Sequence, residues 1–378
     1  MDVIETLGEL VRINSVNAFY PGGPGEGQCA EWVSRFWGAL GIEHRLDPVL
    51  PGRSNVIARL PGRDSSRRLL LEAHMDTVSI SGMTIEPFTP TIQGNRLYGR
   101  GSCDTKAGLA GMMCAVARAH RERRAPPVEV WMAAVVDEEY SCQGILHLCR
   151  ELRADAAIVA EPTEMKVVIA SKGVLRWRII AHGRAAHSSK VHLGLNAIQH
   201  MARLILELER HHDSLATLSH PLLGSPTGNI GLIAGGVQVN FVPDRCTIEI
   251  DRRLLPNESL HDVLAAYQRC LARAELTIPG ASFEMESPML VDRGLETSPA
   301  AAIAVAAARV LRRLGIDATP SGVAFGSDAS KLSDAGIDSI LFGPGSIDQA
   351  HAAVEYVDID QVRQATEFYY DLMMEFEP

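Results

Sequence analysis

The stretch RLLLEAHMDT, residues 68–77, is an apolar run of strand length that ends on His74 and Asp76. Alternate residues of a strand point to the same side, so these two polar side chains can act together. Metal-bound histidines usually donate their second ring N–H to a carboxylate, and Asp76 is placed to accept it. Taken alone, the pair could equally be a histidine at a strand end beside an unrelated aspartate.

Outward from this strand, the first half of the chain alternates apolar runs with helical patterns. Strands are expected at residues 55–60, 68–77, 128–136 and 156–160, and helices at 26–40, 105–121 and 143–152. The same pattern resumes near the end of the chain, with a helix at 298–314, a strand at 339–342 and a helix at 358–374. Such alternation predicts an α/β fold with a mixed, mostly parallel sheet and helices on both faces.

The middle of the chain follows a different order. Strands and helices are expected in the sequence β-α-β-β-α-β, at residues 174–181, 194–210, 228–234, 245–254, 260–274 and 282–286. This order is typical of an α+β, ferredoxin-like sandwich. We therefore predict one α/β domain made of residues 1–174 and 289–378, interrupted by a smaller domain of residues 175–288.

The composition is typical of a chain that buries a core, with 46% hydrophobic and 22% charged residues. A net charge of −10 argues against nucleic acid or an anionic membrane as a partner. The acidic N-terminus does not resemble a secretory signal and no apolar run would span a bilayer, so a cytoplasmic protein is expected. Seven cysteines without C-x-x-C spacing predict mostly reduced, buried thiols, and neither a disulfide framework nor a cysteine-bound zinc.

Other acidic or histidine side chains follow further predicted strands. Asp137, Glu138 and Glu139 close the run at 128–136, and Glu161 closes the run at 156–160. Loops at the carboxyl ends of parallel strands are where α/β sheets hold ligands. The two adjacent glutamates cannot project alike, which predicts two separate roles for them. The alternative is a solvated acidic turn.

Two further residues complete the set. Asp104 ends the glycine-rich loop GRGSCD, residues 99–104, and His351 follows the turn Gly343-Pro344-Gly345. Asp104 could also be a simple N-cap of the next helix. Five strand ends of one sheet would then carry a histidine or a carboxylate. Two histidines and three carboxylates suit zinc or a similar divalent ion, and Glu138 remains for proton transfer.

The motifs LEAHMDTV (71–78), GRGSCDTKAG (99–108), Asp137-Glu138-Glu139 and Glu161-Pro162-Thr163 resemble the family of acetylornithine deacetylase, succinyl-diaminopimelate desuccinylase, aminoacylase and glutamate carboxypeptidase. The resemblance covers nearly the whole chain, in the same order. It implies two co-catalytic divalent metal ions, zinc or alternatively cobalt or manganese, and a catalytic domain with an inserted lid.

The same resemblance implies a role for each of these residues. Asp104 would bridge the two metals, and Glu138 would be the general base while Asp76 orients His74. A cis peptide is implied after Asp104. The remaining ligands would be His74 and Glu161 at one metal, and Glu139 and His351 at the other.

The middle domain also resembles the family's lid. His187, in AHGRAAHSS (181–189), matches a histidine that reaches the active site of a partner subunit, which implies a homodimer through the lid. Asn240 and Arg253 match residues that hold the substrate. The family spacing Asp-x-Arg selects Arg253 over Arg252, and strand alternation sends the two to opposite faces. Without the resemblance, both would be taken as exposed strand arginines. Asp328, in a matching loop, is expected to be structural.

The resemblance thus implies a metal-dependent deacylase acting on small N-acyl amino acids or short peptides. The segment LFGPGSIDQAH, residues 341–351, is most similar to acetylornithine deacetylases, which belong to arginine biosynthesis. Succinyl-diaminopimelate desuccinylase, a dipeptidase and a carboxypeptidase are alternatives. A non-catalytic binding relative would lack ligands or the base, and all are present. A dinucleotide-binding enzyme is disfavoured because Pro24 interrupts the glycines at 22–27 and no strand leads into them.

Overall fold

The computed structural model describes residues 2–378, which form two compact units. The larger unit contains the described residues up to Ile169 together with Glu296–Ser321 and Ser327–Pro378. The smaller unit contains Ala170–Leu295 and Gly322–Gly326, and the predicted insertion of residues 175–288 falls within it.

The larger unit is built on a mixed eight-stranded sheet. Its strands, in spatial order, are β1 (Glu43–Leu50), β2 (Arg53–Leu60), β6 (Val128–Val135), β3 (Asp64–His74), β7 (Ala156–Val159), β17 (Asp338–Leu341), β8 (Val168–Ser171) and β16 (Ser321–Val323). The four central strands β6, β3, β7 and β17 are parallel neighbours. Antiparallel pairs flank them on both sides. The predicted mixed α/β fold with a parallel centre is confirmed.

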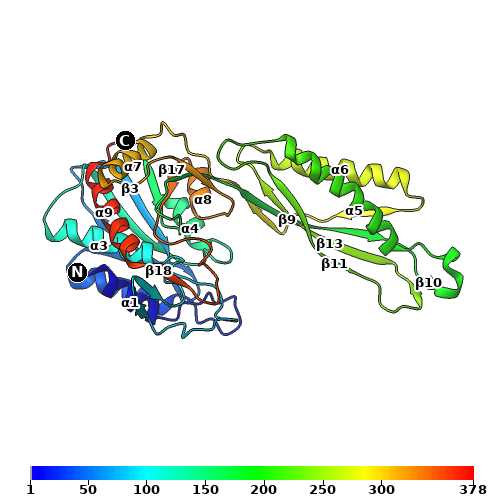
Figure 1. Ribbon diagram of the computed structural model, residues 1–378, viewed down its shortest axis with the longest axis horizontal. Helices are drawn as coiled ribbons and strands as arrows, with labels where there is room; N and C mark the ends of the chain where they lie inside the picture. Colours follow the sequence, from blue (N-terminus) through cyan, green and yellow to red (C-terminus); the bar gives the residue numbers. More distant parts are fainter. Residues whose placement is uncertain (1) are drawn as a thin grey trace. The chain divides into compact units, whose positions relative to one another are not determined.

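Helices cover both faces of this sheet, which explains why the central strands are apolar throughout rather than alternating. Figure 1 shows α3 (Lys106–Arg121) and α9 (Ile359–Glu375) on one side of β3, and α4 (Gln143–Glu151) and α8 (Ala329–Asp334) on the other. Two further helices, α1 (Val3–Arg12) and α7 (Ala302–Leu314), pack against α9. Helix α2 (Gly27–Leu40) packs against β1 and β2.

A separate sheet corrects one detail of the sequence analysis. The short strand before Asp104 is β5 (Arg96–Tyr98), which pairs with β4 (Thr91–Gln93) and β18 (Tyr356–Asp358) in a three-stranded sheet. The prediction that five strand ends of one sheet carry the polar residues is therefore wrong for Asp104. The physical reason is that β5 satisfies its backbone hydrogen bonds with β4, which precedes it across a tight turn, and with β18, both outside the central sheet.

The smaller unit has the predicted order β-α-β-β-α-β. Its elements are β9 (Gly173–His182), α5 (Ala197–Ser214), β11 (Thr227–Gly235), β13 (Arg245–Leu254), α6 (Leu260–Thr277) and β14 (Ser282–Met285). The sheet order is β11-β13-β9-β14, with antiparallel neighbours, and β15 (Leu290–Asp292) also pairs with β9. Along β13 buried residues alternate with less buried ones, because only one face of the sheet packs on the helices.

Short elements lie between these. They are β10 (Ala186–His187), which pairs with β12 (Phe241–Val242), and the 3₁₀ helices η1 (Ser188–Leu193) and η2 (Leu215–Thr217). The helix expected from residue 194 begins at Ala197, after Asn196, whose side chain caps it by accepting the N–H of Gln199 at 3.0 Å.

The seven cysteines form no disulfide with one another, and five of them are buried, as the sequence predicts. Among the described residues, no helix combines the length and the hydrophobicity that crossing a membrane requires.

Candidate metal centre

Four predicted ligands converge in the larger unit. Asp104 lies between two imidazoles, with its Oδ1 3.1 Å from His74 Nε2 and its Oδ2 3.3 Å from His351 Nε2. His351 Nε2 also lies 3.1 Å from Glu139 Oε2. Asp104 thus contacts both histidines with separate oxygens, which is the geometry that a bridging carboxylate needs.

The fold explains this convergence. His74 is the last residue of β3, Glu139 follows β6 and Glu161 follows β7, so three neighbouring parallel strands deliver them to one edge of the sheet. His351 comes from the loop after β17, the fourth strand of the parallel centre. Asp104 arrives from outside the sheet, on the loop that leads into α3.

Glu161 lies in the same cluster. Its side chain is buried, and the carboxylates of Asp104 and Glu138 are near enough to raise its pKa, after burial itself, which is the largest cause. Direct contacts thus link four of the five predicted ligands, and the charges of Asp104 and Glu138 act on the buried Glu161.

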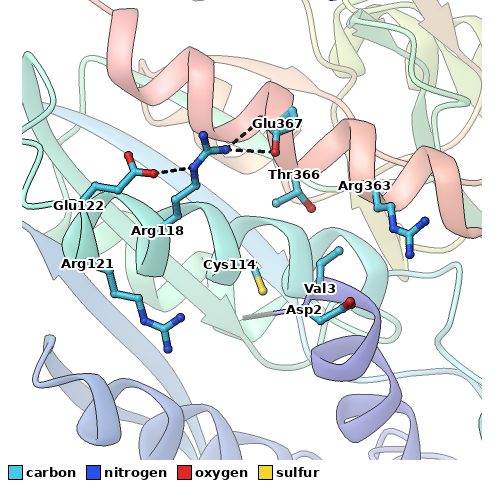
Figure 2. A pocket seen from close by; sticks show the side chains of 9 residues that line it. All are labelled: Asp2, Val3, Cys114, Arg118, Arg121, Glu122, Arg363, Thr366 and Glu367. Atoms are coloured by element: carbon cyan, nitrogen blue, oxygen red, sulfur yellow. Dashed lines mark hydrogen bonds and ion pairs between the residues drawn. The ribbon is translucent and has the colours of Figure 1, made fainter.

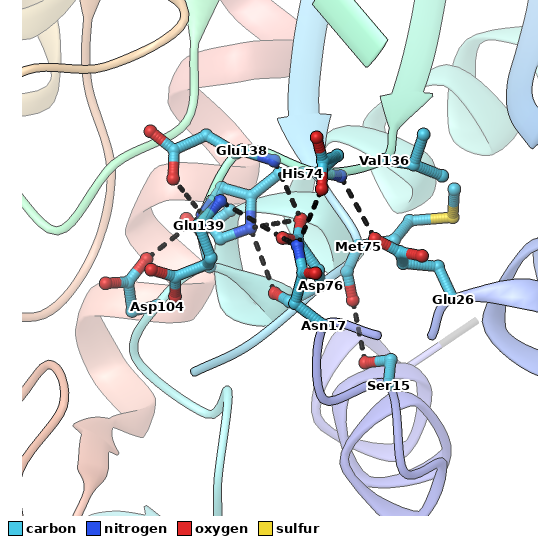
Figure 3. A network of polar contacts seen from close by, with 12 residues as sticks. Ser15, Asn17, Glu26, His74, Met75, Asp76, Asp104, Val136, Glu138 and Glu139 are labelled. Atoms are coloured by element: carbon cyan, nitrogen blue, oxygen red, sulfur yellow. Dashed lines mark hydrogen bonds and ion pairs between the residues drawn. The ribbon is translucent and has the colours of Figure 1, made fainter. Parts of the chain in front are cut away.

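Asp76 organises the loop that carries the two glutamates. Its carboxylate accepts the backbone N–H of Glu138 at 3.2 Å and of Glu139 at 3.0 Å (Figure 3). It also accepts a hydrogen bond from Asn17 Nδ2 at 2.8 Å. His74 Nδ1 lies 3.0 Å from the backbone oxygen of Asp76 and 3.5 Å from its carboxylate. The expected approach of His74 to the Asp76 carboxylate is present, but the backbone oxygen of Asp76 lies closer to the imidazole.

Asp137 has a different place from its two neighbours. Its backbone has a φ of 71°, and its carboxylate turns to Arg53 Nη2 at 2.9 Å and Asn17 Nδ2 at 3.0 Å. Arg53 is held in turn by Glu26 through two hydrogen bonds. Of the three consecutive acids, only Glu138 and Glu139 face the histidines, so the solvated acidic turn is ruled out.

Asp104 does not act as a helix cap. The residue at the N-cap of α3 is Thr105, and its side chain makes no capping hydrogen bond. The peptide bond between Asp104 and Thr105 is cis, as the family resemblance implies.

Sequence reasoning missed Glu355, which holds the Asp104 loop. Its buried carboxylate accepts the backbone N–H groups of Gly101, Cys103 and Asp104 at 3.0, 2.9 and 3.1 Å. It also pairs with the buried Arg100 at 2.6 Å. Only its position four residues after His351 could have drawn attention to it.

The buried carboxylates of the cluster carry more negative charge than nearby groups neutralise, and this shifts their pKa values. Burial raises the pKa of Glu138 to about 7 and that of Glu139 to about 8, and the charge of Asp104 adds to both. Hydrogen bonds to Asp104 and Glu139 raise the pKa of His351 to about 10. Burial acts to raise the pKa of Asp104, but its bonds to His351 and His74 pull it below its usual range. A divalent cation would reverse this balance by favouring the ionised carboxylates and neutral imidazoles.

The residues present fit a metal centre. His74, Asp104 and Glu139 each place one ligand atom within 4.8 Å of the others. Glu139 Oε1 is buried and has no hydrogen-bond partner among the described residues, which leaves it available to a cation. The donor set of two imidazoles and three carboxylates matches the preference of zinc for nitrogen and oxygen ligands.

Three predicted residues belong to the smaller unit. His187 is exposed, and its Nδ1 lies 2.8 Å from Ser189 Oγ. Asn240 is exposed as well. Arg253 is half-exposed and pairs with Asp251 at 2.9 Å, whereas Arg252 is buried and pairs with Glu258 at 2.6 Å. The two arginines do lie on opposite faces, but the alternative in which both are exposed is wrong.

A cavity of about 410 Å³ lies on another part of the larger unit, between α1, α3 and α9 (Figure 2). Arg118 in its wall is already paired with Glu122 and Glu367. None of the predicted site residues lines this cavity.

The sequence of residues 70–375 matches the model of peptidase family M20/M25/M40. The chain belongs to this family. Two similar proteins are an acetylornithine deacetylase from Myxococcus xanthus, 31% identical over 327 residues, and an N-formyl-4-amino-5-aminomethyl-2-methylpyrimidine deformylase from Bacillus subtilis, 28% identical over 377 residues. The alignment with the deacetylase covers 84% of this chain and 82% of that protein. The alignment with the deformylase covers 91% of this chain and 88% of that protein.

Among solved structures, the Bacillus subtilis YXEP protein, a dinuclear metal binding peptidase of the M20 family, has the same fold. It superposes with a TM-score of 0.77 at 16% identity, covering 99% of this chain and 98% of that one. Membership of the M20 family identifies the chain as a metal-dependent hydrolase of small amides or peptides.

Proposed function

We propose that this M20 enzyme removes the acyl group from an N-acyl amino acid, as an acetylornithine deacetylase does. The observation that carries the proposal is the contact of Asp104 with both His74 and His351, beside the carboxylate of Glu138. The similarity of residues 341–351 to acetylornithine deacetylases, and the Myxococcus xanthus relative, favour this substrate class.

The ligand assignment follows from the cluster. His74 and Glu161 would hold one cation, Glu139 and His351 the other, with Asp104 shared between them. A bound pair of divalent cations supplies Lewis acidity, which polarises the amide carbonyl and makes water more acidic. Zinc suits the donors best, and cobalt or manganese are the alternatives.

Glu138 is the proposed general base. Its Oε2 lies 4.0 Å from His74 Nε2, and its side chain is 15% exposed. Because burial raises the pKa of Glu138 to about 7, the carboxylate can accept a proton from water and return it to the leaving nitrogen near neutral pH. Asp76 fixes this residue through the N–H bonds described above.

The smaller unit would supply substrate contacts and a dimer interface. Arg253 would bind the substrate carboxylate through its guanidinium, and Asn240 would contribute a further hydrogen bond. Strand β11 is an edge strand of its sheet, and Leu232 and Ile233 on it are 62% and 57% exposed. An unpaired edge with exposed apolar residues favours pairing with a second copy of the chain. His187 of that copy would then stabilise the oxyanion.

A second candidate is hydrolysis of a different small amide in the same site. The Bacillus subtilis relative is a deformylase, so a formyl group is one possible acyl group. Succinyl-diaminopimelate, dipeptides and carboxypeptidase substrates are the others. These share the same metals and base, and differ only in what the substrate pocket accepts.

A substrate panel separates these candidates. N-acetylornithine, other N-acetyl and N-formyl amino acids, N-succinyl-diaminopimelate and dipeptides should be assayed with zinc, cobalt or manganese added. The proposal expects the highest kcat/KM for an N-acetyl amino acid. A preference for dipeptides by a factor of ten or more would contradict it.

Replacing Glu138 by Gln tests the general base. The amide keeps the size of the side chain but cannot accept the proton, so kcat should fall by about 10²–10⁴-fold. Metal content, measured by atomic emission, should stay near two ions per chain. The matched control is Glu139→Gln, which should lower metal content as well. Turnover near the original rate in Glu138→Gln would remove Glu138 from this role.

A further inference from the structure

A second group of potential ligands lies beside the first. Glu138, Cys142 and Asp328 each place one ligand atom within 4.8 Å of the others. Glu138 and Cys142 come from the segment between β6 and α4, where Cys142 is the N-cap residue of α4. Asp328 is the N-cap residue of α8, and its side chain makes no capping bond there. All three residues belong to the larger unit.

Asp328 points into this group without a partner. It is fully buried, and neither of its carboxylate oxygens has a hydrogen bond to any described residue. Asp328 was expected to be structural, but a structural carboxylate would be held by donors. A buried carboxylate without donors is strongly destabilising unless a cation or a proton balances it.

Glu72 adds to this imbalance. It lies on β3, two residues before His74, so its side chain leaves the same face of the strand. It is 1% exposed, and both of its carboxylate oxygens also lack hydrogen-bond partners within residues 2–378. After burial, the charge of Asp328 is the largest cause that raises the pKa of Glu72, and the charge of Glu138 adds to it. Glu72 and Asp328 are therefore two buried carboxylates without hydrogen-bond partners among the described residues.

Lys331 does not balance these acids by itself. Lys331 on α8 lowers the pKa of both Asp328 and Glu138, and its Nζ donates to the backbone oxygen of Ser327 at 3.2 Å. His74 also lowers the pKa of Glu72, Glu138 and Asp328, but as a proposed ligand of the main centre it would be a neutral imidazole. Lys331 would then be set against three carboxylates.

We propose that Glu138, Cys142 and Asp328 bind a third divalent cation, with Glu72 adding negative charge, and that this cation inhibits the enzyme. A thiolate together with carboxylates suits zinc among the common divalent ions. On binding, the Cys142 thiol releases its proton to solvent and forms the bond from sulfur to metal. Because the thiol must lose its proton before it can bind the cation, this set should fill after the main centre.

Inhibition follows because Glu138 belongs to both sets. A carboxylate that coordinates a cation cannot also take a proton from water. This consequence rests on the proposed function of Glu138, whereas the cation site itself does not.

Cobalt titration tests the site without reference to activity. Thiolate coordination to Co²⁺ gives an intense near-ultraviolet charge-transfer band, and the main centre contains no cysteine. The metal-free protein titrated with Co²⁺ should show the band only beyond two equivalents. Cys142→Ser should abolish it. Cys149→Ser is the matched control, since Cys149 is also half-buried and near Asp328 but outside the ligand set, and it should keep the band. A missing band, or one that persists in Cys142→Ser, would overturn the proposal.

Zinc inhibition tests the consequence. Turnover with two equivalents of zinc should be the same in Cys142→Ser and in the original protein. Additional zinc should inhibit the original protein. At least about tenfold more free zinc should be needed in Cys142→Ser, because loss of an outer-shell contact alone already costs about 10–100-fold in metal affinity. A cobalt band without inhibition would leave the site intact but overturn its inhibitory role. Absence of turnover at two equivalents would instead count against the proposed function.

Discussion

At the scale of single residues, the centre depends on buried carboxylates that accept backbone N–H groups. Asp76 holds the loop with Glu138 and Glu139 in this way, and Glu355 holds the loop with Asp104. Strand alternation was enough to single out Asp76 from the sequence. Glu355 could not be identified from the sequence, because its hydrogen-bond partners lie more than 250 residues earlier and no local pattern marks it.

Replacing Glu355 by Gln should weaken the metal centre. The amide places its own donor against the N–H groups of the Asp104 loop and leaves the buried Arg100 without its charge partner. Metal affinity, measured by competition with a chelator, should fall about 10–100-fold. At saturating metal, kcat should recover towards the original value, because Glu355 positions Asp104 and does not touch substrate.

The matched control is Glu164→Gln, an exposed glutamate paired with Lys166. It should leave metal affinity unchanged. Equal affinity in Glu355→Gln, in a protein shown by circular dichroism to be folded, would refute the positioning role.

At the scale of elements, the parallel centre of the sheet decides where the site forms. The apolar runs at 128–136, 68–77 and 156–160 were recognisable because buried parallel strands are hydrophobic throughout, and their ends predicted His74, Glu139 and Glu161. Strand β1 was not recognisable, because it is an edge strand with charged residues and Pro48. The separate sheet of β5 was also hidden, since strand pairing is set by residues distant in the chain.

A histidine on α5 makes the stability of the smaller unit depend on pH. Burial, and then the charges of His211 and Arg252, lower the pKa of His212 to about 4, and its Nε2 lies 2.9 Å from the hydroxyl of Tyr267. In the unfolded chain its pKa returns to the ordinary value for histidine of about 6.5. Between these values the unfolded state binds more protons, so the stability supplied by neutral His212 is complete above pH 6.5 and is lost as pH falls towards 4.

Urea unfolding at pH 7.5, 5.5 and 4.5 measures this effect. The midpoint should fall with pH, and His212→Gln should reduce that fall. His261→Gln, at a position with an 89% exposed side chain, is the control and should behave like the original protein. An identical pH dependence in His212→Gln and the original would contradict the account.

At the scale of the whole molecule, the proposed ligands lie on both sides of the smaller unit in the sequence. His74 to Glu161 precede it and His351 follows it, so the centre is complete only when both parts of the larger unit have folded together. The β-α-β-β-α-β order of the insertion was predictable from its periodicity. That Gly322–Gly326 also belong to the smaller unit could not be predicted, because a segment of five residues carries no periodic signal.

Mixing two inactive variants tests whether sites are shared between subunits. If His187 acts in the partner's site, a mixed dimer of His187→Ala and Glu138→Gln has one complete site. After unfolding and refolding together, the mixture should regain about a quarter of the original activity, as random pairing into symmetric dimers predicts. Each variant refolded alone should stay inactive, and a mixture no more active than the variants would exclude the shared site.

The central claim is that side chains from both parts of the larger unit hold a pair of cations. Anomalous X-ray diffraction at the zinc edge, from crystals grown with two equivalents of zinc, measures this directly. Two peaks are expected on either side of Asp104, one beside His74 and Glu161 and the other beside Glu139 and His351. Peaks bound to other surfaces, with none at these residues, would contradict the account.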